Sequence, residues 1–250
     1  MTTPKKQYVR EMREKFGYFA TWHPALKLQL GDVGVLRDQE FIRESSLRDF
    51  GITFDIQPGG ENASLSYESP RSVQVTFKPA GSALVGSSLG LKEAGAVVEF
   101  QREAAVVFKA TGCRTHSIAN QFALGQEILQ RYRDGRWDKR RVIITELVTV
   151  RSATILISST GGAKAELRVV GKVGVAAQSL AEVSSQLELA AARDVELKVV
   201  GQGELTPLFR ASGVKPSLFG DAAFLHRGQD EAPEEVADVV FAQLEEADLG

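Results

Sequence analysis

The stretch RRVIITELVTVRSATILIS, Arg140–Ser158, is the longest β-forming segment of this 250-residue chain. β-Branched and other apolar residues are dense from Arg141 to Ser158, which predicts one long strand. A helical pattern precedes it at His116–Arg133, where apolar residues recur every three or four positions and Gly135 ends the helix. Strands do not alternate regularly with helices along the chain, so a doubly wound or barrel α/β fold is not expected.

Further strand signals lie on both sides of these two elements. The strongest run is Ser72–Lys78, where apolar and polar residues alternate with period two. Strands are also predicted for Leu26–Leu30, Ile52–Ile56, Ala96–Ala110, Ala165–Val175, Leu187–Ala190 and Val195–Val200. The sequence therefore predicts an α+β fold, a twisted and mostly antiparallel β-sheet with a mid-chain helix and flanking helices. We expect Leu205–Leu225, which mixes Pro, Gly and aromatic residues, to be loop with short helical turns.

The composition is that of an ordinary globular chain, with 43% hydrophobic and 25% charged residues. It excludes a disordered, collagen-like or coiled-coil protein. The single cysteine, Cys113, excludes a disulfide scaffold and a cysteine-based zinc site. Neither a secretory signal nor an apolar run of the roughly 18 residues that a membrane helix needs is found, so we expect a soluble, cytosolic chain. The net charge of −2 does not suggest nucleic-acid binding.

The charge is distributed unevenly. Residues 229–250 hold eight acids and no base, which leaves residues 1–228 with a net charge of about +6. The acidic segment has Pro233 and acids at its start and an apolar stripe of Val236, Val239, Val240 and Leu244, which predicts a helix. It is either a solvated terminal helix or a regulatory segment that covers a functional surface. The polar stretch before it, which includes His226, Arg227, Gly228 and Gln229, is a candidate cleavage site.

Two basic clusters are candidate binding surfaces. The first lies on the predicted N-terminal helix and consists of Lys5, Lys6, Arg10 and Arg13. Apolar residues at helical spacing accompany it, a pattern that suits either a membrane surface or a packed terminal helix. The second follows the mid-chain helix and consists of Arg131, Arg133, Arg136, Lys139, Arg140 and Arg141. It could bind phosphate, lipid headgroups or the acidic segment, or be a solvated helix end.

The sequence offers no recognisable catalytic motif, neither a phosphate-binding loop nor a nucleophile elbow nor a zinc motif. Cys113 and His116 are close in sequence, but this spacing rarely gives a nucleophile facing its base, so a structural cysteine is expected. The carboxylates of Glu99, Glu146 and Glu166 form no recognisable pair and are expected to face solvent. We therefore expect no enzyme, no cofactor and no metal.

The order of elements resembles the pore-forming domain of gasdermins, in particular the short bacterial ones. The resemblance rests on LKLQLGDVG at Leu26–Gly34, the Ser/Gly/Ala-rich strand pair at Ser82–Val107, the mid-chain helix with its basic end, and Arg140–Ser158. It spans roughly residues 17–228. Many bacterial members carry a lipidated cysteine near the N-terminus, which this chain lacks.

The resemblance implies a two-part organisation. Residues 1–228 would be a β-rich pore-forming domain, and 229–250 an acidic segment that holds it inactive until an associated protease removes it. The freed domain would insert β-hairpins into a membrane rich in anionic lipids and assemble with copies of itself, in bacterial cell death and anti-phage defence. The chain would be cytoplasmic when inactive and at the inner membrane when active. The alternative is a soluble β-rich binding or adaptor module that never enters a membrane.

Overall fold

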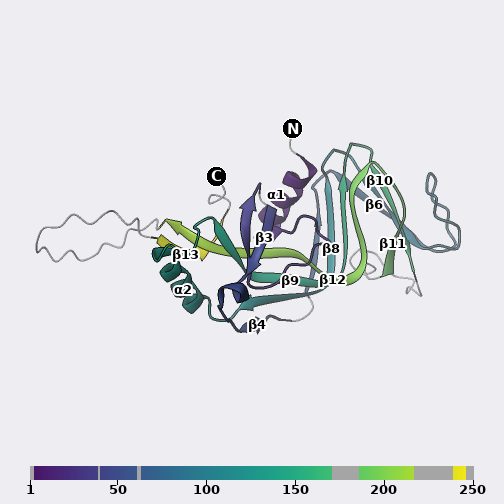
Figure 1. Ribbon diagram of the computed structural model, residues 1–250. Coiled ribbons are helices and arrows are strands. Elements are labelled where there is room, and N and C mark those ends of the chain that lie inside the picture. The colour runs from purple at the N-terminus through teal and green to yellow at the C-terminus, as the bar shows by residue number, and fades with distance from the viewer. Residues whose placement is uncertain (1–2, 39, 61–62, 171–185, 217–238, 246–250) are drawn as a thin grey trace, which may run out of the picture. The chain divides into compact units, whose positions relative to one another are not determined.

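The computed structural model describes residues 3–38, 40–60, 63–170, 186–216 and 239–245 (Figure 1). In chain order the elements are α1 (Pro4–Phe16), β1 (Phe19–Ala20), β2 (Asp32–Arg37), β3 (Glu40–Ser46), a 3₁₀ turn η1 (Leu47–Phe50), β4 (Ile56–Pro58), β5 (Ala63–Glu68), β6 (Val73–Lys78), β7 (Gly95–Phe100), β8 (Val106–Ile118), α2 (Gln121–Arg133), β9 (Arg141–Ser158), β10 (Lys164–Val169), β11 (Leu187–Arg193), β12 (Val195–Pro216) and β13 (Val239–Gln243).

The chain forms two compact units. Unit 1 comprises residues 1–28, 58–116 and 147–209, and unit 2 comprises residues 29–57, 117–146 and 210–250. The two longest strands, β9 and β12, each contribute residues to both units. The described part of the acidic segment, residues 239–245, belongs to unit 2, and the predicted boundary at residue 228 lies outside the described residues.

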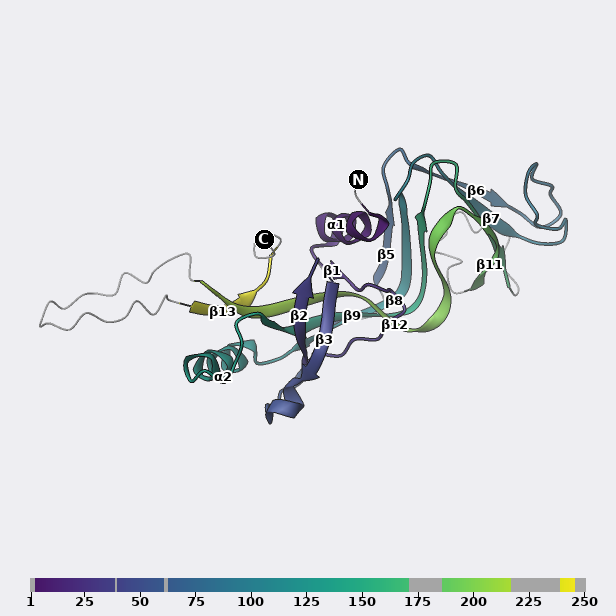
Figure 2. The same ribbon diagram turned by 45° about the horizontal axis from the view of Figure 1, so that its top comes forward.

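A four-stranded sheet in the order β11-β10-β7-β6 makes one part of unit 1 (Figure 2). It consists of two antiparallel hairpins, β6–β7 and β10–β11, joined by antiparallel pairing of β10 with β7. In β6–β7, Val73 is opposite Phe100 and Lys78 is opposite Gly95. Gly95 is required at this point, because a Cβ there would collide with the carbonyl oxygen of Leu167 on β10.

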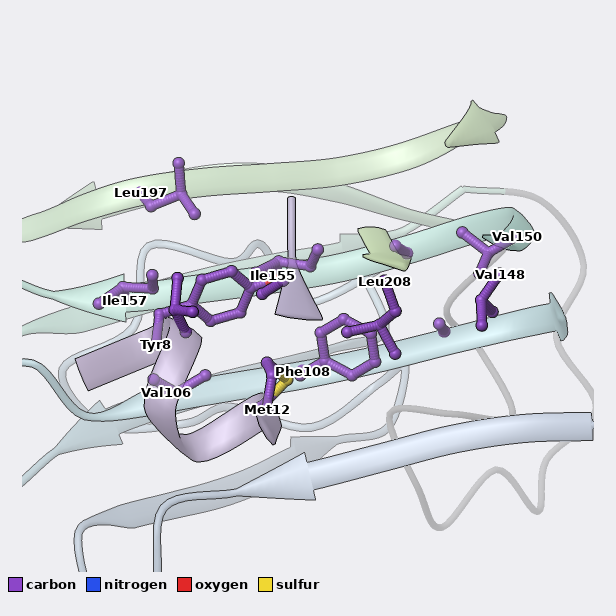
Figure 3. Close-up of a cluster of buried hydrophobic side chains, with 14 of the residues drawn as sticks. Tyr8, Met12, Val106, Phe108, Val148, Val150, Ile155, Ile157, Leu197 and Leu208 are labelled. Carbon is purple, nitrogen blue, oxygen red and sulfur yellow. The ribbon is translucent and has the colours of Figure 1, made fainter. Parts of the chain in front are cut away.

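The rest of unit 1 packs α1 against long strands. Helix α1 begins where the Thr3 hydroxyl accepts a hydrogen bond from the Lys6 amide, and it ends at Gly17, whose φ of 72° suits glycine. Tyr8 and Met12 on its inner face are fully buried among side chains of β8 and β9, including Phe108 (Figure 3). A second buried cluster joins the apolar face of the four-stranded sheet to Val107 of β8 and Leu156 of β9.

In unit 2, α2 packs on strands. The antiparallel hairpin β2–β3 pairs through β2 with the first residues of β9, and β13 pairs antiparallel with the end of β12. Helix α2 begins at Asn120, whose side chain accepts a hydrogen bond from the Ala123 amide at 3.1 Å. Its buried residues Leu124, Ile128 and Leu129 share a core with Trp137.

The structure confirms the α+β class, with mostly antiparallel strands and two α-helices among the described residues. The predicted strand Arg141–Ser158 coincides with β9. The mid-chain helix is also confirmed, but it begins at Gln121 because His116 still belongs to β8.

Four predictions about local structure are wrong. In Ile52–Ile56 only Ile56 belongs to a strand, because the Ile52 amide donates to the Leu47 oxygen of the 3₁₀ turn at 2.9 Å. Leu26–Leu30 is not a strand, because the Thr206 hydroxyl binds the Leu26 oxygen and the Leu28 amide in place of a strand ladder. Residues 205–216 are not a loop, because β12 continues to Pro216. Val239–Gln243 is a strand and not a helix, because it pairs with β12 residue by residue.

Candidate functional site

The four-stranded sheet has one apolar and one polar face. Its apolar face carries Val73, Val75 and Phe77 of β6 with Ala96, Val98 and Phe100 of β7, all within the second buried cluster of unit 1. The hairpin strands are short, with six residues each in β6 and β7. The connection between these strands, Pro79–Ala94, is much longer than the two to five residues usual for a hairpin.

Charged side chains of the sheet hold this connection. The ammonium group of Lys78, which is only 2% exposed, donates hydrogen bonds to the carbonyl oxygens of Gly90 at 2.8 Å and Glu93 at 2.6 Å. On β10, the carboxylate of Glu166 accepts hydrogen bonds from the amide of Ser88 at 2.7 Å and from its hydroxyl at 2.5 Å. Lys164 donates to the Gly86 oxygen and lies 3.4 Å from the Glu166 carboxylate. Polar contacts therefore tie the connection to both hairpins.

Glu166 does not face solvent, contrary to the expectation from the sequence, since it is only 6% exposed. Burial by itself would raise the pKa of Glu166, but the hydrogen bonds from Ser88 and the nearby Lys164 outweigh it and lower this pKa. A hollow of about 420 Å³ beside Glu166 is also lined by Glu99 and Arg193. Glu99 is exposed as expected, and Glu146 is partly buried and pairs with Arg210 at 3.5 Å.

The basic residues of α1 lie on a helix whose apolar face is already used. Lys6 and Arg10 are exposed, whereas Lys5 and Arg13 are partly buried. The Arg13 guanidinium lies over the ring of Phe19, 4.2 Å from its centre. Because Tyr8, Val9 and Met12 are buried, the apolar face of α1 is not available to a membrane in this state.

A buried carboxylate fastens α1 to the strands. Glu11, 4% exposed, accepts hydrogen bonds from Gln7 at 2.5 Å, Ser69 at 2.6 Å and Arg102 at 2.8 Å. The pKa of Tyr67 is raised to about 12, mainly because the side chain is buried and secondly because the negative charge of Glu11 is near. The network was not predicted, because Ser69 and Arg102 are 58 and 91 positions from Glu11 along the chain.

The second basic cluster, Arg131–Arg141, is largely neutralised by acids. Ion pairs join Arg131 to Glu127 at 2.7 Å, Arg140 to Asp138 at 2.6 Å and Arg141 to Glu44 at 3.5 Å, and Arg136 to Asp134. The hydrogen bonds from Arg140 hold the pKa of Asp138 at about 2.

Two bases of this cluster keep their charge uncompensated. Arg133 and Lys139 are exposed, and no described residue forms an ion pair with either. Nearby, a hollow of about 390 Å³ carries both signs of charge, since Arg37 and Arg140 line it together with Glu44 and Asp138. The cluster is therefore a weaker anion-binding surface than its sequence suggested.

The end of the acidic segment occupies a sheet edge in unit 2. Strand β13 pairs with Ser212–Pro216 of β12, with Phe241 opposite Val214. Phe241 packs against α2 at Gly125, where a Cβ would come within 3.0 Å of the Phe241 ring. Leu244, 7% exposed, donates its amide to the Ala211 oxygen at 2.9 Å. Gly125 therefore makes room for the aromatic ring on the helix surface.

Only part of the predicted inhibitory contacts can be placed. Val239 contacts the core and Leu244 is buried, whereas Val240 points outward with 37% exposure. Phe241 was missed because the helical spacing selected the wrong face. In VVFAQ, a strand pattern with side chains alternating between two faces would have placed Phe241 on the same face as Val239. Val236 and the candidate cleavage region His226–Gln229 lie outside the described residues.

Cys113 and His116 do not form a catalytic pair. Both lie on β8, three positions apart, so their side chains point to opposite faces of the strand. Burial raises the pKa of the Cys113 thiol, which disfavours the reactive thiolate. Within the described ranges, no three His, Cys, Asp or Glu side chains gather as a metal site would require. The helices described here are also too short or too polar to cross a bilayer.

Comparison with known proteins gives no relative from which a function could be taken. The chain matches no protein-family model. It also matches no curated protein.

Proposed function

We propose that this chain is an autoinhibited, gasdermin-like pore-forming protein that inserts the hairpins β6–β7 and β10–β11 into an anionic membrane and oligomerises once its C-terminal segment is released. The observation that carries the proposal is the four-stranded sheet of two hairpins, each with a long connection. Chemistry at a catalytic centre has no part in this function, which would come from insertion and assembly.

The length of the connections supports insertion. A strand needs about 9–11 residues to cross a bilayer, more than the six in β6 or β7. If the connection joined the hairpin, each arm would reach about 14 residues, enough to span. The second hairpin has a connection of similar length between Val169 and Leu187.

The sequence of the first connection also suits a membrane strand. With the register of β6–β7 continued, Ala83 and Val85 fall on the face of Val73, and Ala80 and Ser82 fall on the opposite face. Between Val73 and Leu91 the chain has one charged residue, Lys78. Apolar residues on one face and small or polar residues on the other are typical of a pore-lining hairpin.

Strand β13 supports the autoinhibitory part of the proposal. It covers the backbone of Ser212–Pro216 and the α2 surface at Gly125, and the segment to which it belongs, residues 229–250, has eight acids and no base. Its loss would uncover a sheet edge, which is prone to pair with another strand. It would also leave a basic chain suited to anionic lipid.

A protease site inserted between Gly228 and Gln229 of the full chain tests the proposal. We expect the uncut protein to leave dye-filled vesicles of phosphatidylcholine and phosphatidylglycerol intact, and the cut protein to empty them and oligomerise. Vesicles of phosphatidylcholine alone and an inactivated protease are the controls. If the cut protein, freed of its C-terminal segment, stays monomeric and the vesicles stay full, the pore function is wrong. Co-purification with a protein partner without lipid would then favour the soluble binding module.

A further inference from the structure

The connection Pro79–Ala94 is held by charge rather than by apolar packing. Leu89 is the one buried residue within it, whereas Val85 is fully exposed and Leu91 is 65% exposed. Little hydrophobic free energy therefore opposes its departure from the sheet. Its strongest contacts are the hydrogen bonds to three charged side chains, Lys78, Lys164 and Glu166, which we name the charged clasp.

The charged clasp joins the two hairpins. Lys78 is the last residue of β6 and binds two carbonyl oxygens of the connection that follows it. Lys164 and Glu166 belong to β10, in the other hairpin, and bind Gly86 and Ser88. Hydrogen bonds to charged groups are about twice as strong as neutral ones, and buried ones are costly to leave unmade. The clasp thus holds the β6–β7 hairpin in its short form and fastens its connection to β10 of the other hairpin.

The clasp must open before β6 and β7 can lengthen. In a longer hairpin, Pro79 would lie opposite Ala94 and the connection would leave the surface of β10. The Gly90 and Glu93 oxygens would then lose their hydrogen bonds from Lys78, and the Ser88 amide would lose its hydrogen bond to Glu166. These contacts are distinct from those of β13, which pairs with β12 and packs on α2 at Gly125.

We propose that the charged clasp is a second lock, separate from the C-terminal segment, and that the connection Pro79–Ala94 opens as a unit of its own before the hairpins lengthen. The inference rests on the proposed function for its second step, insertion. Its first step, independent opening of the connection, concerns the intact chain without lipid.

The test compares Glu166→Gln with Glu188→Gln in the full chain. Glu188 forms an exposed ion pair with Arg168 at 3.0 Å on the same sheet, but it does not contact the connection. Amide hydrogen exchange of residues 79–94, without lipid, should accelerate about 10- to 100-fold in Glu166→Gln, from the loss of a charged hydrogen-bond acceptor. Exchange in β7 and β10 should not change, and Glu188→Gln should match the wild type. Lys164→Gln is the second variant, to be used if Glu166→Gln does not fold.

The second readout is vesicle leakage after the cut at residue 228, which should begin sooner in Glu166→Gln than in Glu188→Gln. Equal exchange in the two variants, or acceleration throughout unit 1, would show that the connection does not open independently and would overturn the proposal. If Glu166→Gln exchanges faster but causes leakage no sooner, while the cut wild type does empty the vesicles, the proposed order of opening before insertion is wrong. A cut wild type that never leaks would instead refute the pore function, and exchange alone would then decide whether the clasp exists.

Discussion

Replacing Phe241 by alanine should loosen strand β13 while the rest of unit 2 stays folded. Truncating a fully buried phenylalanine costs about 3–5 kcal/mol. The ring of Phe241 is only partly buried, so we expect Phe241→Ala to destabilise the docked strand by about 2 kcal/mol. Since 1.36 kcal/mol is a factor of ten, the strand should open about 30 times more often. Leu244→Ala, at a site 7% exposed, should act in the same direction and at least as strongly.

Hydrogen exchange of the uncut chain measures this opening. Peptides that cover 239–245 and 208–216 should exchange faster in Phe241→Ala, because both partners of the ladder lose protection together. Val240→Ala is the matched control, since Val240 is the next residue along the strand and points outward. Its effect should stay within about 0.5 kcal/mol.

A substitution on α2, against which Phe241 packs, gives an independent test. Gly125→Leu on α2 would place a side chain where the Phe241 ring lies, and so displace β13 without changing its sequence. The reasoning is refuted if Val240→Ala loosens the strand as much as Phe241→Ala does. It is also refuted if Phe241→Ala unfolds the whole of unit 2, because β13 would then be part of the core and not a separable strand.

Three further predictions concern single groups. The pKa of Glu166 is lower in the folded chain, so the carboxylate stabilises the docked connection Pro79–Ala94 at any pH above the usual glutamate pKa. This stabilisation is lost as the pH falls through the lowered pKa. Hydrogen exchange of the connection, corrected for the intrinsic rate, should measure this loss, with Glu166→Gln as the pH-insensitive reference. Tyr8→Phe should stabilise the chain by up to about 1 kcal/mol in denaturant unfolding, because the buried Tyr8 hydroxyl has no hydrogen-bond partner among the described residues. A clear loss of stability would contradict this. Replacing Arg133 and Lys139 together by serine should weaken sedimentation of the cut chain with anionic vesicles about 30-fold, at about 1 kcal/mol for each base, whereas the paired Arg136→Ser should change it much less.

The sequence predicted the elements whose local pattern and tertiary environment agree. In β9 the run of β-branched residues predicts a strand and no other element. In β6 the alternation of Val73, Val75 and Phe77 matches a sheet with one buried face. The α2 pattern succeeds for the same reason, because Leu124, Ile128 and Leu129 form one buried face.

The errors lie where a distant partner decides the conformation. Val239–Leu244 fits a helical stripe as well as a strand, and pairing with β12 selects the strand. Pro207 suggested a loop, yet β12 tolerates it, and its carbonyl oxygen accepts a hydrogen bond from Thr21 at 2.9 Å.

The candidate sites could be predicted only in part, for a related reason. Counting charges identified the bases of Arg131–Arg141 but not which of them are paired, and Glu44, the partner of Arg141, is remote in sequence. The charged clasp was not predicted at all. Ser88 and Glu166 are 78 positions apart, and no local pattern marks a glutamate that a loop will cover.

The chain supplies β13 to its own sheet through about 22 residues that follow Pro216. This covalent tether makes the pairing of β13 with β12 intramolecular, so the strand re-pairs more readily than a separate peptide would. A cut in the tether removes that advantage and leaves every contact of β13 in place, so the strand becomes a free ligand with an ordinary dissociation constant. Occupancy of the β12 edge after a cut is then governed by dilution: β13 stays paired in concentrated cut protein and dissociates in dilute cut protein, and an added peptide with the sequence VVFAQL restores the pairing.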